Sequence, residues 1–132
     1  MGFIEKCNVE SLAKFVNRAT VRDFEFMVSK PVEKDGDDSG PMPSEYFLAS
    51  LAACQAFSYR AVAEKRGVKI DELRVESEME LENGEVVRIR EDVFVKSSEP
   101  KQKLEALEAL SQKVCTIGKA CRVPVEYVYH YA

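Results

Sequence analysis

Residues 43–59 are apolar on almost every side when they are placed on a helix. A helix without a polar face is normally buried in a protein core or spans a membrane. Ser50, Gln55 and Ser58 interrupt the apolar run before it reaches the roughly 20 residues that a membrane span needs. The pattern therefore predicts a long helix buried in the centre of the protein.

The ends of this helix carry boundary signals. Ser44, after Pro43, is the expected N-cap, because its hydroxyl can accept a backbone N–H of the first turn that has no other partner. Glu45 follows in the first turn, where the helix dipole favours an acidic side chain. Gly67 marks the expected end.

Cys54 lies near the middle of the helix, and small alanine side chains surround it. Another element can therefore approach closely, which predicts a tight and mostly dry site. A free cysteine in such a site is most simply a small buried apolar residue. A nucleophilic or redox role stays open at this point.

Residues 20–28, before the helix, alternate between apolar and polar positions. This alternation predicts a strand that also carries Arg22. We expect one or two further strands before it, near residues 4–9 and 12–16. The loop 31–43 is rich in turn-forming and acidic residues, and its simplest interpretation is a solvated connection.

Residues 70–81 and 85–96 are two more alternating segments, separated by a turn that contains Asn83 and Gly84. Asn-Gly is the strongest short hairpin signal, because both residues tolerate the positive φ of a type I′ turn. The pattern predicts an antiparallel hairpin.

A second amphipathic pattern follows Pro100. Its apolar side chains recur at helical spacing on one face: Leu104, Leu107, Leu110 and Val114. The predicted helix packs this face on the sheet and brings Cys115 to its C-terminal end, before Gly118 breaks it. Residues 122–131 then predict a last strand, in which His130 is most simply a strand residue without a chemical role.

Strands, a buried helix, a hairpin, an amphipathic helix and a final strand thus follow one another along 132 residues. This order is typical of an α+β protein, and the length fits one domain over residues 1–132. A net charge of −4 without a dense run of Lys or Arg gives no reason to expect a nucleic-acid partner. Residues 1–6 lack the pattern of a signal peptide, so we expect a cytoplasmic protein without a membrane partner.

The four cysteines are Cys7, Cys54, Cys115 and Cys121. In a chain without an export signal, a structural disulfide framework is not expected. No two of them have the C-x-x-C spacing, and the chain has one histidine, so we expect no metal site. Redox or nucleophilic use of one or two thiols remains open.

Two cysteine contexts together form a specific pattern. Residues 40–45 (GPMPSE) lead into residues 51–54 (LAAC), and residues 114–120 (VCTIGKA) precede the final strand. In this order they resemble the OsmC/Ohr family of osmotically induced and organic hydroperoxide resistance proteins. The resemblance covers residues 20–131.

This resemblance implies a thiol peroxidase with an OsmC-like fold, in which antiparallel sheets surround a long buried central helix. It implies that Cys54 attacks a hydroperoxide and that Cys115 resolves the product as a disulfide. Glu45, in the family's Pro-x-Glu motif, then helps to orient an active-site arginine. The family also implies an intertwined homodimer, no bound cofactor, and an external thiol reductant such as a dihydrolipoyl group or another dithiol.

The sequence departs from the family pattern at two places. Residues 115–118 read Cys-Thr-Ile-Gly, where the family commonly has Cys-Pro-x-Ser. Val32 stands where the organic hydroperoxide branch commonly has an arginine in a Pro-Arg-Glu step. Cys7 and Cys121 have no role in the family pattern, and we interpret both as structural.

Without an arginine at position 32, another cation has to favour the Cys54 thiolate. A cysteine with an ordinary pKa of about 8.5 is only a few per cent ionised at neutral pH, and burial disfavours the charged form further. We favour Arg22, because its planar guanidinium can orient both Glu45 and a peroxide oxygen. The other candidates are Lys30, Lys34 and Arg60.

Two hypotheses result. The first is an enzyme, a cysteine-based peroxidase that reduces organic hydroperoxides to alcohols through a Cys54 sulfenic acid and a Cys54–Cys115 disulfide. The second is a non-catalytic redox-sensing or small-molecule binding module on the same fold. Peroxide consumption with a dithiol donor separates the two.

Overall fold

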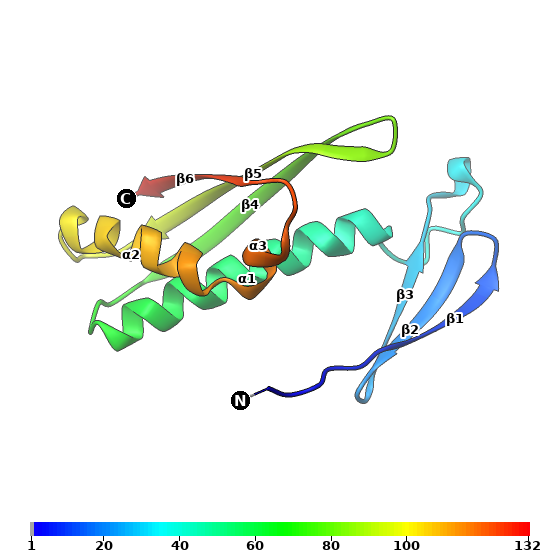
Figure 1. Cartoon of the computed structure of the whole chain (residues 1–132), viewed down its shortest axis with the longest axis horizontal. Coiled ribbons are helices and arrows are strands. Elements are labelled where there is room, and N and C mark those ends of the chain that lie inside the picture. The colour runs from blue at the N-terminus through cyan, green and yellow to red at the C-terminus, as the bar shows by residue number, and fades with distance from the viewer. Residues whose placement is uncertain (1) are drawn as a thin grey trace. The chain divides into compact units, whose positions relative to one another are not determined.

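The computed structural model describes residues 2–132 (Figure 1). The chain divides into two compact units, one that ends at Phe47 and one formed by Leu48–Ala132. Helix α1 (Pro43–Lys65) begins in the first unit and continues through the second. Whether residues 1–132 act as a single domain stays a prediction.

The first unit contains a three-stranded antiparallel sheet in the order β1-β2-β3. Its strands are β1 (Asn8–Ala13), β2 (Val16–Val21) and β3 (Phe24–Ser29). The single strand expected over residues 20–28 is wrong, because the chain turns at Arg22 and Asp23 between β2 and β3. Arg22 has a φ of 54°, and a positive φ at the first position is what a tight two-residue hairpin turn requires.

The segment between β3 and α1 packs against β3 and includes the short 3-10 helix η1 (Val32–Lys34). The Ser29 N–H donates to the Pro41 carbonyl, and the Asp38 N–H donates to the Lys30 carbonyl, both at 3.1 Å. At Gly40 an added Cβ would come within 2.1 Å of the Met27 carbonyl oxygen, so only glycine allows this approach. The connection is mostly solvent-exposed, as expected, but these contacts also anchor it to β3.

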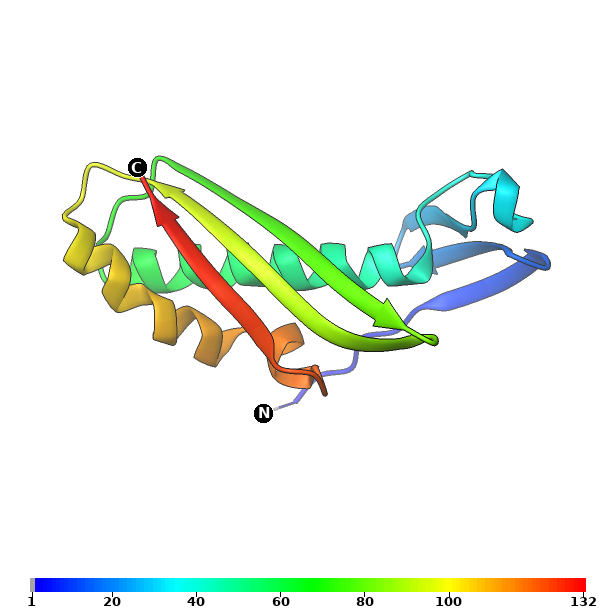
Figure 2. The same cartoon turned by 90° about the horizontal axis from the view of Figure 1, so that it is seen from above.

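The second unit contains a three-stranded sheet in the order β4-β5-β6 (Figure 2). Its strands are β4 (Glu72–Glu82), β5 (Glu85–Lys96) and β6 (Val125–Tyr131). The predicted hairpin is confirmed, with positive φ angles of 52° at Asn83 and 79° at Gly84. The expectation of antiparallel sheets is wrong for β5 and β6, which are parallel because the chain between them crosses over through helices.

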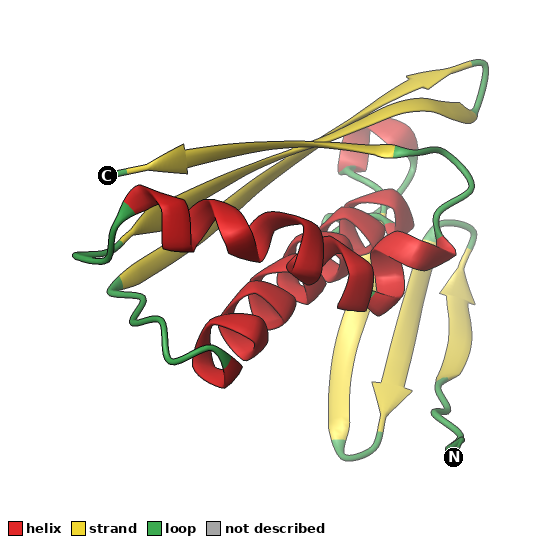
Figure 3. Cartoon of the chain, turned by 60° about the vertical axis from the view of Figure 1, so that its left-hand side comes forward, coloured by secondary structure: helices red, strands yellow, loops and turns green. Residues whose placement is uncertain are grey.

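These crossover helices are α2 (Lys101–Val114) and α3 (Thr116–Ala120). Helices α1 and α2 lie on the same face of the sheet (Figure 3). Their buried apolar side chains form one core with those of β5: Tyr59, Ala63, Val93, Val95, Leu104 and Leu107. The Tyr59 hydroxyl donates to the Leu104 carbonyl at 2.9 Å, which joins the two helices.

The buried face of α2 differs from the prediction at its C-terminal end. Leu104 and Leu107 are buried as expected, but Val114 is 48% exposed and Ser111 is fully buried. Ser111 is tolerated there because its hydroxyl donates to the Glu108 carbonyl at 2.8 Å and accepts from the Gln55 side chain at 3.1 Å.

Helix α1 is not buried on all sides within one chain. Leu51, Gln55 and Tyr59 are buried, whereas Phe57 on the other side is 78% exposed. The side of α1 that carries Phe57 therefore lacks full cover in the single chain. None of the helices within residues 2–132 has the length and hydropathy of a membrane span.

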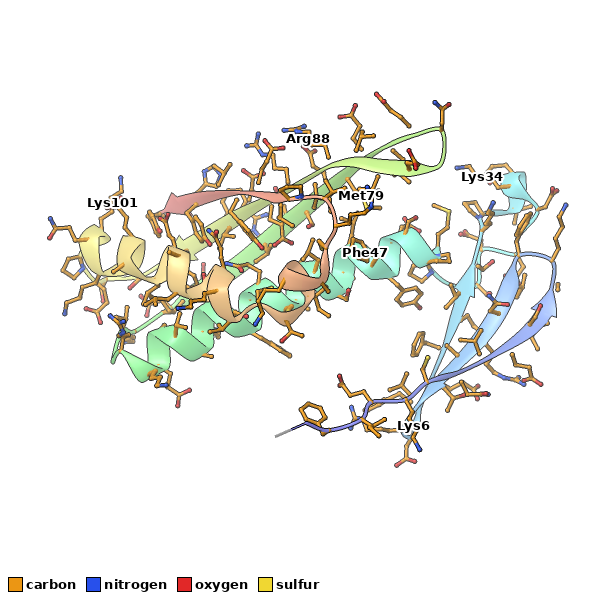
Figure 4. All side chains as sticks on the ribbon, in the orientation of Figure 1. Lys6, Lys34, Phe47, Met79, Arg88 and Lys101 are labelled. Atoms are coloured by element: carbon orange, nitrogen blue, oxygen red, sulfur yellow. The ribbon has the colours of Figure 1, made fainter. Side chains whose placement is uncertain are left out.

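Charged side chains occupy the opposite face of the second sheet, where Arg88 points away from α1 and α2 (Figure 4). Arg88 pairs with Glu126 at 2.7 Å, and His130 pairs with Asp92 at 2.8 Å. The pKa of Asp92 is lowered to about 2, first by the Arg90 hydrogen bond and then by that of His130. The pair with Asp92 gives His130 a structural role on the exposed face.

Candidate dithiol site

Cys54 and Cys115 are neighbouring thiols in the second unit. Cys54 lies on α1 and is partly buried, whereas Cys115 lies at the junction of α2 and α3 and is fully buried. The pKa of Cys115 is raised to about 11, chiefly by burial, and the adjacent Cys54 thiol contributes to the increase. The two residues that the sequence paired are thus brought together, and their chemical roles stay predictions.

The backbone around Cys115 holds its side chain in place. Cys115 ends α2 and caps α3, and its Sγ accepts the Gly118 N–H at 3.4 Å. We expected Gly118 to break the helix. It lies inside α3 instead. The break falls at Cys115 itself, which has an extended backbone with ψ of 100°.

Gln55, the residue after Cys54, fixes this part of α1 against two other elements. Its Nε2 donates to the Ser111 hydroxyl on α2 at 3.1 Å and to the Tyr129 hydroxyl on β6 at 3.0 Å. Gln112 also donates to Tyr129, at 3.1 Å. This buried network orients the turn of α1 that carries Cys54.

A buried carboxyl group, Glu91, belongs to the same site. Glu91 is fully buried on β5, where Ile89 and Val93 share its face of the sheet. Its Oε2 accepts the Ser77 hydroxyl at 2.7 Å, and its Oε1 is buried without a hydrogen-bond partner among residues 2–132. Burial raises the pKa of Glu91, and its charge in turn contributes to the raised pKa of Cys115.

Tyr127 on β6 lies between Glu91 and Cys115 in this site. It is the register partner of Glu91 in the parallel pair, and its hydroxyl lies 2.9 Å from where a Cβ on Gly118 would be. That same Cβ would lie 3.2 Å from the Cys115 Sγ. Glycine at position 118, one of the departures from the family pattern, therefore leaves room for the Tyr127 hydroxyl beside Cys115.

Glu45 and Arg22 are engaged locally in the first unit. Glu45 Oε1 accepts the Met42 N–H at 2.8 Å, so Met42 is the N-cap residue and Pro43 is the first helical residue. The prediction of Ser44 as the N-cap is wrong by this geometry. Arg22 lies in the β2–β3 turn over the Phe24 ring at 4.9 Å, and not within a strand. The joint role of Glu45 and Arg22 toward Cys54 stays a prediction.

The other proposed cations have different surroundings. Lys30 lies over the Phe15 ring at 4.0 Å, and Arg60 is exposed on α1. Lys34 ends η1, the short helix in which Val32 is 67% exposed.

The remaining cysteines, Cys121 and Cys7, have different surroundings. Cys121 is partly buried, and its thiol donates to the Ile117 carbonyl at 3.3 Å. Burial raises the pKa of Cys121, and Glu91 adds to the increase. Cys7 is exposed before β1. Within residues 2–132, no group of three or more His, Cys, Asp or Glu side chains has the arrangement of a metal site.

The sequence analysis missed Glu91, Ser77 and Tyr127. A signal for Glu91 was present, since it falls at an inward position of the alternation between Ile89 and Val93. Ser77 could not be found from the Asn83-Gly84 turn, because the register shifts between Glu80 and Leu81, and without this shift Arg90 would lie opposite Ser77 in place of Glu91. Tyr127 could not be found either, because its register depends on a parallel pairing.

The OsmC-like protein family matches residues 36–128 of this chain. Similar solved structures include an OsmC-like protein from Mycoplasma pneumoniae, with 12% identity, a TM-score of 0.90, and coverage of 100% of this chain and 99% of that chain. An organic hydroperoxide resistance protein OsmC from Legionella pneumophila has 18% identity, a TM-score of 0.72, and coverage of 98% and 97%. The organic hydroperoxide resistance protein OhrB of Bacillus subtilis has 20% identity, a TM-score of 0.70, and coverage of 98% and 98%.

At these identities the similarity to solved structures shows the fold alone. The comparison with curated proteins finds no match.

Proposed function

The chain belongs to the OsmC-like protein family, and from this premise we propose that it is a cysteine-based peroxidase that reduces organic hydroperoxides to alcohols. The observation that supports this proposal most is the pairing of a partly exposed thiol, Cys54, with a fully buried neighbouring thiol, Cys115. Such an arrangement suits a first thiol that is accessible to the hydroperoxide and a second, buried thiol that reacts only with the oxidised first one.

In the first step, the Cys54 thiolate attacks one oxygen of the hydroperoxide and the O–O bond breaks. The alkoxide takes a proton and leaves as an alcohol, and Cys54 becomes a sulfenic acid. In the second step, Cys115 attacks the Cys54 sulfur, water leaves, and a disulfide forms. An external dithiol then reduces this disulfide by two thiol–disulfide exchanges.

A cation has to favour the thiolate in the first step, because burial alone disfavours it. Arg22 is the group we propose, with Glu45 holding its guanidinium. A bidentate contact between a carboxylate and a guanidinium fixes both groups in one plane, which would leave an N–H donor for the peroxide oxygen.

We also propose a homodimer. Phe57 on α1 is 78% exposed, and the neighbouring Ala53 is exposed as well. A second copy of the chain that covers this stripe would remove apolar surface from water and complete the burial expected of the helix.

One observation favours a second function, a redox sensor. Cys115 is fully buried, and burial raises the pKa of its thiol and favours the protonated form, so unassisted disulfide formation by Cys115 would be slow. A protein that forms its disulfide slowly would be oxidised by peroxide and so respond to it, but it would not turn over rapidly.

Steady-state consumption of an organic hydroperoxide with a dithiol donor distinguishes the two functions. We expect multiple turnovers in the wild type and none in Cys54→Ser. In the absence of the dithiol, Cys115→Ser should consume one equivalent of hydroperoxide and retain a sulfenic acid. Cys7→Ser is the matched control, because Cys7 is exposed and lies in the other unit. A wild type that reacts once and then stops would instead support the sensor.

A further inference from the structure

Glu91 is an unusual residue for the face of the sheet on which it lies. It is fully buried, and its neighbours on that face of β5 are the apolar Ile89, Val93 and Val95. A carboxyl group in an apolar layer is costly unless its hydrogen bonds are complete. Glu91 has a hydrogen bond to one oxygen, from Ser77, whereas Oε1 is buried and unpaired within residues 2–132. An apolar residue would suit packing alone better, which points to a chemical use.

Glu91 lies next to Tyr127 in the sheet, and the Tyr127 hydroxyl in turn lies near Cys115. Ser77 on β4 and Tyr127 on β6 flank Glu91 in the register of the sheet. The Tyr127 hydroxyl and the Cys115 Sγ meet at Gly118, whose missing side chain leaves space for both. The titratable groups of this cluster are Cys54 on α1, Cys115 and Cys121 at the two ends of α3, and Tyr127 on β6.

We propose that Glu91 is the proton acceptor that prepares Cys115 for disulfide formation. This inference rests on the proposed function for its place in a catalytic cycle. Glu91 acts on the second step and leaves the reaction of Cys54 with hydroperoxide to other groups.

The step balances within the protein. The Cys115 thiol gives its proton to the Glu91 carboxylate, and its sulfur attacks the sulfur of the Cys54 sulfenic acid. The S–S bond forms and the S–O bond breaks, so the Cys54 sulfur is reduced and the Cys115 sulfur is oxidised. The leaving hydroxide takes the proton from Glu91 and departs as water, which restores the carboxylate.

A simple electrostatic role for Glu91 predicts the opposite behaviour. A negative charge near Cys115 disfavours its thiolate, so removing that charge should make Cys115 more reactive. A proton acceptor instead makes Cys115 more reactive when it is present. The sign of the effect of Glu91→Gln therefore decides between the two roles, and glutamine preserves the size of the side chain and an acceptor for Ser77.

The test uses the full chain with Cys7→Ser and Cys121→Ser, so that Cys54 and Cys115 are the remaining thiols. Cys54 is converted to a mixed disulfide with thionitrobenzoate, and attack by Cys115 releases the coloured thiolate. At neutral pH we expect Glu91→Gln to slow this release about 100-fold, the lower end of general-base catalysis. Glu126→Gln, on the opposite face of the sheet, is the matched control and should leave the rate unchanged.

The pH dependence gives a second readout that a merely structural role would not change. The wild-type rate should level off well below the raised pKa of Cys115, whereas the Glu91→Gln rate should keep rising about tenfold per pH unit toward it. An unchanged or faster release in Glu91→Gln would overturn the proposal. If that variant does not fold, a wild-type profile governed by a single ionisation near the Cys115 pKa would overturn it equally.

The probe contains no hydroperoxide, so the two proposals can fail separately. A wild type that does not consume hydroperoxide contradicts the proposed function, while the release rates still test the proton acceptor. Conversely, an active peroxidase in which Glu91→Gln closes its disulfide normally contradicts the role of Glu91 alone.

Discussion

The Cys54 thiol lies beside the Cys115 thiol, and of the two Cys115 is the fully buried one. Three elements produce this relationship. Gln55 holds α1 against α2 and β6, the α2–α3 junction places Cys115, and Gly118 leaves space around its sulfur. Because the site depends on these few supports, single substitutions should separate its parts.

Gly118→Ala should destabilise the protein, because it crowds the Tyr127 hydroxyl and the Cys115 sulfur. The added methyl group would lie 2.9 Å from the Tyr127 hydroxyl and 3.2 Å from the Cys115 Sγ. Although alanine favours a helix, we expect a net loss of about 1–2 kcal/mol in the free energy of unfolding from overpacking. Urea denaturation measures the loss.

Two further variants test whether the close approach to the Tyr127 hydroxyl causes this loss of stability. Adding Tyr127→Phe removes the hydroxyl and should recover most of the stability lost in Gly118→Ala. Gly2→Ala, where an added Cβ meets nothing within 4 Å, should have no effect. Equal losses with and without the Tyr127 hydroxyl would show that the close approach is not the cause.

Glu91→Gln should change how stability depends on pH. Burial raises the pKa of Glu91 above its usual 4.5, so the folded protein holds this proton more tightly than the unfolded chain. Its contribution to stability is therefore complete below about pH 4.5 and is lost as pH rises through the folded-state pKa. Relative to the wild type, Glu91→Gln should gain stability from acidic to neutral pH.

Urea denaturation of both proteins between about pH 4 and pH 8 measures this difference, with a limiting slope of about 1.4 kcal/mol per pH unit. The control, Glu126→Gln, removes an exposed carboxylate and should not gain stability over this range. A stability difference between Glu91→Gln and wild type that is constant with pH would contradict the raised pKa.

Arg22→Met should slow alkylation of Cys54 and shift its pH dependence upward, since it removes the cation proposed to favour the thiolate. Arg60→Met should leave both nearly unchanged, because position 60 lies on a different face of α1 from position 54. The alkylation rate against pH is measured on a background that lacks the other cysteines. Equal behaviour of the two variants would remove Arg22 from the site.

Phe57→Glu should convert the proposed homodimer into a monomer. It places a charge where an apolar side chain is 78% exposed in the single chain, and burial of that charge in an interface is costly. Val114→Glu, at an apolar position of α2 that is 48% exposed, is the matched control and should remain dimeric. Sedimentation at micromolar concentration measures both. A wild type that sediments as a monomer of 14.9 kDa would contradict the dimer.

The parts of the fold that depend on residues close together in the sequence could be predicted from local patterns. The Asn83-Gly84 turn fixed the hairpin, because both residues tolerate its positive φ angles. The spacing of Leu104 and Leu107 identified the buried face of α2. Val114 was misplaced because a buried Ser111, satisfied by Gln55 and its own helix, occupies that face instead.

Features that depend on distant pairing could not be predicted in the same way. The parallel pairing of β6 with β5 arises from the crossover through α2 and α3, which no local pattern encodes. This pairing is what sets Tyr127 beside Glu91. The two cysteine motifs identified the thiol pair and the family, but they said nothing of the carboxyl group next to them.

The most direct test of the account treats the reduced protein with one equivalent of an organic hydroperoxide and maps its peptides without reduction. We predict a cross-linked pair that contains Cys54 and Cys115, together with one equivalent of the alcohol. A disulfide between Cys115 and Cys121, or a Cys54 that remains a free thiol while the hydroperoxide persists, would contradict the account.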